Sequence, residues 1–327
     1  MSPIKQILVS FCVKCYNQEE YIGAALDGAF SQTYRPLEII ISDDCSTDSS
    51  VEIIEQKIAE YKACRGDIPV FFNRNKKNLG NVGNWLVFGD IAHGELLVKA
   101  DGDDISLPER TSKIVDAWVN NGKKAKVIDH VASNMDLQGV DIKGYRRNLG
   151  AAQAYSIECW KRFPVKGNVP PREWVGDDTI FSIRAYAIGG AGRFQLSMND
   201  VLVRYRCGCG ATTSPRKYRD VFSSHSTECI LYALRDVELN EKFLEPKNVS
   251  ATKVWCLRRA RESELNKRLA SSKKITERVC AAISLRREFG CVSLRDNVFQ
   301  IMLSLPPVLI DGILNFYLRI RWRFRRM

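Results

Sequence analysis

The acidic run at residues 101–104, Asp-Gly-Asp-Asp, is the feature that most constrains this chain. It follows the apolar residues 96–98, which predict a buried strand. Three carboxylates in four positions repel one another, so a positive partner is needed close by. Mg²⁺ and Mn²⁺ prefer carboxylate oxygens and usually keep open positions for phosphate and water. The run therefore predicts a site for a divalent cation, and the simpler alternative is an acidic turn before a helix.

Segments typical of strands and helices alternate through the first 120 residues. Apolar, β-branched runs and helical spacing predict strands at 7–13, 37–41, 70–72 and 96–98, and helices at 17–29, 50–63, 82–91 and 109–120. This alternation is typical of an open, mostly parallel α/β sheet flanked by helices. Polar residues follow several of these strands, and the carboxyl ends of parallel strands meet at one edge. We therefore expect one shared ligand site at that edge.

The second half of the chain has weaker periodicity. It predicts a strand at 125–131, a loop at 132–149, a helix at about 151–162, a loop at 164–171, strands at 193–196 and 201–205, a loop at 206–214 and helices from 215 onward. Asp177 and Asp178 begin a further helix, where acidic residues are favoured by the helix dipole. Because a site is already expected at residues 101–104, we prefer a functional role for this pair.

The positive charge of the chain lies at its carboxyl end. Residues 251–327 hold 17 of the 49 Lys and Arg and 6 of the 38 Asp and Glu, so they carry the whole formal charge of +11. The first 250 residues then hold 32 groups of each sign. We expect a neutral globular domain at 1–214 and a helical region at 215–327 that ends in a basic segment.

The basic segment predicts attachment to a membrane surface. Residues 298–318 are largely apolar, and the arginines that follow alternate with Trp322 and Phe324. Pro306, Pro307 and Asp311 interrupt the apolar run, which argues against a membrane span. Aromatic side chains in the interface and arginines on anionic headgroups fit better. A core helix with a solvated basic end is the alternative, and nucleic-acid binding is disfavoured because no basic face continues the segment.

The cysteines indicate a reducing environment. The chain has 11 cysteines, scattered and odd in number, and the first apolar run lacks the basic flank and cleavage site of a signal peptide. We therefore expect free thiols and a location in the cytoplasm, on the cytoplasmic face of the inner membrane.

Six motifs in order resemble the family-two glycosyltransferases, which have the GT-A fold. The motifs are residues 13–22 (VKCYNQEEYI), 41–48 (ISDDCSTD), 78–81 (NLGN), 101–104 (DGDD, the DxD motif), 176–178 (GDD) and 204–214 (RYRCGCGATTS). Two departures stand out. Cys45 replaces a glycine that is usual in the second motif, and the last motif lacks the usual histidine, with Cys207 and Cys209 nearby.

The resemblance implies roles for the matching residues. Asp44 would bind the nucleotide base, in a pocket lined by Cys15, Tyr16, Asn17, Asn78 and Gly80. Asp101 would face the ribose or sugar, and Asp103 would bind the metal together with Asp101. Asp178, or else Asp177, would be the general base. The implied reaction is an inverting, metal-dependent transfer of sugar from a UDP-, GDP- or dTDP-linked donor to a glycan hydroxyl. Mg²⁺ or Mn²⁺ would neutralise the departing diphosphate, and the carboxylate base would take the acceptor proton.

The basic segment and the resemblance together imply a lipid-linked acceptor, as in assembly of bacterial surface polysaccharide of the O-antigen or lipopolysaccharide kind. Two alternatives remain open. A sugar nucleotidyltransferase should carry a glycine-rich basic loop after its first strand, whereas residues 14–20 are acidic and lack glycine. A non-catalytic sugar-nucleotide or membrane scaffold should have lost the acidic residues at 103 or 177–178, which are all present.

Overall fold

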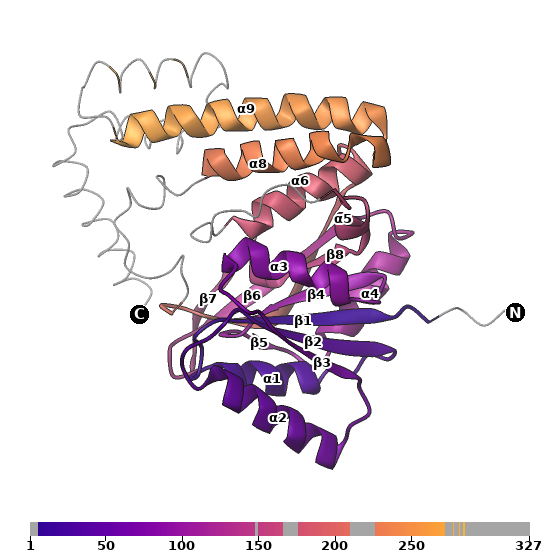
Figure 1. Cartoon of the computed structure of the whole chain (residues 1–327), viewed down its shortest axis with the longest axis vertical. Coiled ribbons are helices and arrows are strands. Elements are labelled where there is room, and N and C mark those ends of the chain that lie inside the picture. The colour runs from indigo at the N-terminus through magenta and orange to yellow at the C-terminus, as the bar shows by residue number, and fades with distance from the viewer. Residues whose placement is uncertain are drawn as a thin grey trace, which may run out of the picture.

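The computed structural model describes residues 6–147, 150–165, 176–209 and 226–271, and singly Glu277, Ala281 and Ser284. Over these residues a nine-stranded mixed sheet lies between two groups of helices (Figure 1). The strands are β1 (Val9–Cys15), β2 (Leu37–Asp43), β3 (Val70–Arg74), β4 (Leu96–Asp101), β5 (Ile105–Ser106), β6 (Val127–Met135), β7 (Asp141–Arg146), β8 (Gln153–Ser156) and β9 (Gln195–Arg206). The helices are α1 (Ile22–Phe30), α2 (Ser50–Cys64), α3 (Gly80–Ile91), α4 (Arg110–Asn120), α5 (Glu158–Lys161), α6 (Asp177–Gly189), α8 (Ser226–Leu239) and α9 (Pro246–Ser271).

The sheet has a parallel half and a mixed half. Its strand order is β3-β2-β1-β4-β8-β6-β9-β5, and β7 pairs with β6 outside this path. The first four strands are parallel, as the sequence predicts, and the direction changes at β8, which is antiparallel to both β4 and β6. The long β6–β9 pairing is again parallel. The α/β fold with a mostly parallel sheet is therefore confirmed.

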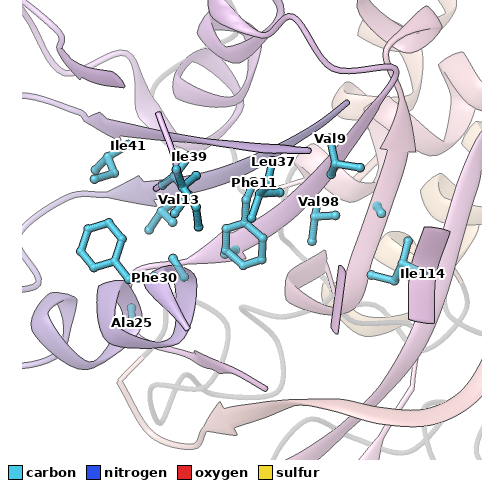
Figure 2. Packing of buried hydrophobic residues seen from close by; sticks show 14 of the residues in the cluster. Val9, Phe11, Val13, Ala25, Phe30, Leu37, Ile39, Ile41, Val98 and Ile114 are labelled. Atoms are coloured by element: carbon cyan, nitrogen blue, oxygen red, sulfur yellow. The ribbon is translucent and has the colours of Figure 1, made fainter. Parts of the chain in front are cut away.

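Alternating side chains of the parallel strands build two cores, one on each face of the sheet. Phe11 of β1, Ile39 of β2 and Val98 of β4 face α1, α2 and α4, and Figure 2 shows them in the same apolar cluster as Phe30. The intervening residues, such as Cys12, Ile40 and Leu97, face α3, α5 and α6 on the opposite side. Because both faces are covered, strands β1, β2 and β4 are mostly apolar. Burial of a side chain such as Phe11 contributes about 1.5–3 kcal/mol.

Helices α8 and α9 add an outer layer over α6 (Figure 1). Ile180 and Ile183 of α6 belong to the apolar cluster that α8 and α9 complete. A buried ion pair also joins α6 to α8, with Arg184 Nε 2.7 Å from Asp236 Oδ2. Helix α6, which begins with Asp177 and Asp178, is thus packed on one side against α8 and α9 and on the other against the core beside the sheet.

Four local predictions differ from the structure. The expected loop at 132–149 is mostly the hairpin formed by β6 and β7, whose polar residues lie on an exposed face. The expected helix at 151–162 is a 3₁₀ turn (Gly150–Ala152), strand β8 and the short α5, because a four-residue strand is too short to show a period. The strands expected at 193–196 and 201–205 are one strand, β9, with register shifts against β6. The first helix begins at Ile22, since residues 18–21 form a turn.

Several expectations fall on residues outside the described part. The basic segment with Trp322 and Phe324, the loop at 210–214 and the domain boundary after residue 214 all lie there. Among the helices that the structure does describe, none combines the length and the apolar character needed to cross a bilayer.

Candidate active site

The carboxyl ends of β1, β2 and β4 bring the predicted polar residues to one edge of the sheet. In the parallel register Lys14 of β1 lies beside Asp101 of β4, and Cys15 lies beside Asp43 of β2. The turn after β4 then carries Asp103 and Asp104. The expectation of one shared edge is met for these strands.

The three acidic residues after β4 form a cluster. One carboxylate oxygen from each of Asp101, Asp103 and Asp104 lies within 4.8 Å of the others. The turn is compact, because the backbone N–H of Asp104 donates to the carbonyl of Asp101 at 3.1 Å. A Cβ atom at Gly102 would lie 2.4 Å from Gln18 Oε1 and 2.9 Å from the carbonyl oxygen of Lys14. Only glycine therefore fits at this position.

Two arginines, Arg110 of α4 and Arg206 of β9, make hydrogen bonds around the acidic turn. The Arg110 side chain is fully buried, and its guanidinium donates to the carbonyl of Lys99 at 2.7 Å and to Ser106 Oγ at 2.8 Å. Arg206 of β9 donates its backbone N–H to Asp104 Oδ1 at 2.8 Å and its Nε–H to the carbonyl of Asp103 at 2.9 Å. These two arginines hold the turn in place.

The pKa values of the three carboxyls differ because their surroundings differ. Burial raises the pKa of Asp101, but the charges of Lys14 and Lys99 outweigh this and leave it below its ordinary value. Burial and the charge of Asp101 raise the pKa of Asp103. Burial and both neighbouring carboxylates raise the pKa of Asp104 well above its ordinary value. A bound cation would favour the charged form of each.

The cluster has the chemistry of a divalent-cation site. Asp104 Oδ2 is buried and has no hydrogen-bond partner in the described part of the chain. Asp101 Oδ1 is within ion-pair distance of Lys14 but likewise accepts no hydrogen bond there. Oxygen-only donors with unsatisfied lone pairs suit Mg²⁺ or Mn²⁺. The residues present therefore fit the expected metal.

Asp177 and Asp178 at the start of α6 have different environments. Asp177 is 4 % exposed and accepts hydrogen bonds from Lys99 Nζ of β4 and from Asn81 Nδ2 of α3. Asp178 accepts from the backbone N–H of the adjacent Thr179 at 2.8 Å. Burial and the charge of Asp177 raise the pKa of Asp178. Asp177 is thus held in an ion pair with Lys99, whereas the carboxylate of Asp178 accepts a hydrogen bond from its own turn.

Asp44 organises the loop before α3. Its carboxylate accepts from the backbone N–H groups of Leu79 and Gly80, both at 2.8 Å, and from Asn75 Nδ2 at 2.9 Å. The side chain is 2 % exposed. The Asn78 side chain also accepts from the N–H of Gly80, at 2.9 Å. The expected contact of Asp44 with a nucleotide base stays a prediction, and its visible role is to position this loop.

Two of the first three residues expected to line the nucleotide pocket, Tyr16 and Asn17, are exposed. Cys15 is buried, whereas Tyr16 is 45 % exposed. Asn17 has a positive φ of 48°. Its Oδ1 accepts a hydrogen bond of 2.8 Å from the backbone N–H of Thr47, in the loop after β2. Cys45 also has a positive φ, 64°, at the position where the resembled motif has glycine. Loops 15–17 and 44–47 therefore form one bonded unit whose contact with a nucleotide stays a prediction.

The basic residues of the site were not predicted from the sequence. Lys14 is 3.1 Å from Asp101 Oδ1, and Lys99 pairs with Asp177. No site role was predicted for Arg110 or for Arg206, although Arg206 lies in the motif at 204–214. The available signal was a charged residue inside an apolar strand, since a buried lysine needs an acidic partner. Cys209, which lies in the last motif where the usual histidine is missing, donates a hydrogen bond from its thiol to Asp103 Oδ2 at 3.4 Å.

Comparison with known proteins agrees with this geometry. Residues 10–155 match the model of Glycosyl transferase family 2. Abequosyltransferase RfbV of Salmonella typhimurium is 29 % identical over 144 residues, which are 43 % of this chain and 41 % of that protein. The chain thus spans less than half the length of this curated relative.

Two solved structures share the fold. The S. aureus TarS fragment 1–349 in complex with UDP-GlcNAc superposes with a TM-score of 0.59 at 17 % identity, over 94 % of this chain and 89 % of that one. The mannosyltransferase PcManGT from Pyrobaculum calidifontis, in complex with GDP-Man and Mn²⁺, gives 0.53 at 16 % identity, over 96 % and 88 %. The chain therefore has the GT-A fold, and its residues 10–155 are similar to Glycosyl transferase family 2.

Proposed function

We propose that this protein transfers a sugar from a nucleoside diphosphate donor to a hydroxyl of a glycan acceptor, with inversion and with a divalent cation. The observation that carries the proposal is the pairing of two acidic groups across β1 and β4. One is the cluster Asp101, Asp103 and Asp104, and the other is the pair that begins α6. Lys14 is close enough to Asp101 and Asp177 to interact electrostatically with both groups.

The acid cluster supports donor binding. A divalent cation held by Asp103 and Asp101 would neutralise negative charge on the diphosphate leaving group. Arg206 and Arg110 keep the turn rigid, so little reorganisation is needed when the donor binds. The structures of similar fold in complex with UDP-GlcNAc and GDP-Man support UDP or GDP as the nucleotide, and dTDP stays a prediction.

Asp178 supports proton removal from the acceptor. Its carboxylate has a raised pKa and accepts a hydrogen bond from the backbone N–H of Thr179 in its own turn. Asp177, by contrast, is bound by both Lys99 and Asn81. Double displacement would need a second carboxylate as nucleophile beside the base. With one of the two acids held in an ion pair, a single displacement with inversion is the better fit.

A lipid-linked acceptor and attachment to the cytoplasmic face of the membrane complete the proposal. They rest on the basic carboxyl-terminal segment and on the similarity to an abequosyltransferase. The sugar nucleotidyltransferase alternative is weaker, because residues 17–19 after β1 bond residues 46–49 of the next loop and carry no glycine-rich phosphate cradle.

A donor screen tests the function. Metal-free protein is incubated with UDP-, GDP- and dTDP-sugars, with or without Mn²⁺ or Mg²⁺, and release of nucleoside diphosphate is measured. We expect metal-dependent release from one donor, lost in Asp103→Asn and retained in Asp200→Asn, a change at an exposed acid that pairs with Lys113. Proton NMR should show the released sugar with inverted anomeric configuration. No release and no thermal shift with any sugar nucleotide would contradict the proposal.

A further inference from the structure

Lys14 links the two acidic groups of the site. Its Nζ lies 3.1 Å from Asp101 Oδ1 and donates a hydrogen bond to Asn81 Oδ1. Asn81 Nδ2 donates in turn to Asp177 Oδ1, and Lys99 donates to Asp177 Oδ2. Four elements, β1, β4, α3 and α6, therefore contribute to one polar chain that starts at the acid cluster and ends at the beginning of α6.

The ammonium group of Lys14 stays charged at this place. Burial alone would lower the pKa of Lys14, but the carboxylates of Asp101 and Asp177 raise it above its ordinary value. The side chain is 19 % exposed, as is that of Asp101, so water screens the pair only in part. Lys14 is also close enough to Asp103 for their charges to interact.

A charged ammonium and a divalent cation compete for the same carboxylate. The cation would need oxygens of the acid cluster, and Asp101 Oδ1 faces Lys14. Two positive groups close together repel strongly in a partly buried site. An anionic diphosphate relieves that repulsion, because it brings negative charge to both. Lys14 should therefore disfavour the bare cation more than the cation that arrives with a donor.

We propose that Lys14 is a positioning residue: it is the counter-ion that Asp101 keeps until metal and nucleotide bind together. The inference rests on the proposed function, since it assumes a divalent cation in the acid cluster. Lys14 lowers the affinity of the site for metal alone and makes metal binding depend on the nucleotide. Such coupling is reciprocal, so the metal also raises the affinity for the nucleotide. Through Asn81, the exchange of partners at Asp101 reaches Asp177 as well.

Three variants, compared with the wild type, separate the charge of Lys14 from its hydrogen bond. Lys14→Gln removes the charge and keeps a donor for Asn81, whereas Lys14→Arg keeps the charge. Lys113→Gln removes a lysine from an exposed pair and serves as the matched control. Thermal melts confirm the fold of each variant. If Lys14 only supports the structure, its replacement should weaken metal binding. If Lys14 is a counter-ion of Asp101, its replacement by glutamine should strengthen metal binding.

Isothermal titration with Mn²⁺, first alone and then with UDP or GDP, tests the inference. We expect Lys14→Gln to bind Mn²⁺ alone at least about tenfold more tightly than the wild type, with less gain from the nucleotide. Lys14→Arg and Lys113→Gln should match the wild type. Equal or weaker binding of Mn²⁺ alone by Lys14→Gln would overturn the inference. Tighter binding of Mn²⁺ alone by Lys14→Arg would also overturn it, and this second test holds even if Lys14→Gln does not fold. If no protein binds Mn²⁺ with or without nucleotide, the metal in the proposed function fails too.

Discussion

Replacement of Asp177 tests whether this acid is a structural partner of Lys99. Lys99 is 3 % exposed, and its ammonium pairs with Asp177 and lies 5.0 Å from the centre of the Trp85 ring. Removing one member of a buried ion pair leaves an uncompensated charge and typically costs about 3–5 kcal/mol. We therefore expect Asp177→Ala to lower the unfolding free energy by about that amount. The melting temperature should fall by roughly 6–20 °C.

The double variant Lys99→Met/Asp177→Asn separates the lost charge from the lost packing. It removes both charges and keeps an acceptor for Asn81, so it should recover most of the stability. Urea unfolding of the wild type, both single variants and the double variant gives the coupling energy. Asp200→Asn, in an exposed pair with Lys113, should cost only about 0–1 kcal/mol. A loss below about 1 kcal/mol in Asp177→Ala, or a double variant no more stable than the singles, would refute the assignment.

Three further predictions concern the same edge of the sheet. Asp178 must be ionised to act as base, and burial and the charge of Asp177 raise its pKa, so kcat should fall as the pH drops through that raised pKa. Asp177→Asn removes the neighbouring charge and should therefore move this acidic fall in kcat to lower pH. A fall in kcat at the same pH in the variant would exclude Asp178 as the titrating group. Cys45→Gly should stabilise the protein by up to about 1 kcal/mol in urea, since a side chain at φ 64° is strained and glycine is not; a lower stability would contradict this. Gly102→Ala should lower the unfolding free energy by about 1–3 kcal/mol and abolish metal-dependent turnover, because its Cβ would lie 2.4 Å from Gln18 Oε1. Gly23→Ala is the control and should be tolerated, because its Cβ would meet nothing closer than 3.6 Å.

The sequence predicted the parallel half of the fold because three of its four strands are buried on both faces. Strands β1, β2 and β4 are nearly continuous apolar runs, and the helices between them keep a helical period. The antiparallel half was mispredicted. Strand β8 is four residues long and lies between β4 and β6, so its state depends on its neighbours rather than on its own pattern.

The acidic residues of the site were predictable, and their partners were not. Three carboxylates in one turn indicate a site whatever surrounds them. A lysine in a strand, such as Lys14 or Lys99, shows only that some acid must be near, and the register that brings Asp101 or Asp177 to it comes from the fold. The unequal roles of Asp177 and Asp178 follow from these partners, which is why the sequence alone left both as candidates for the base.

Comparison of Asp178→Asn with Asp177→Asn tests the account most directly. Both variants are nearly isosteric, and each is assayed for nucleoside diphosphate release from the preferred donor and for donor affinity by titration. Loss of the general base predicts that Asp178→Asn lowers kcat by about 10²–10⁴ while donor affinity stays within a few fold. Asp177→Asn should lower stability and retain more turnover than Asp178→Asn. Turnover by Asp178→Asn at the wild-type rate would contradict the account.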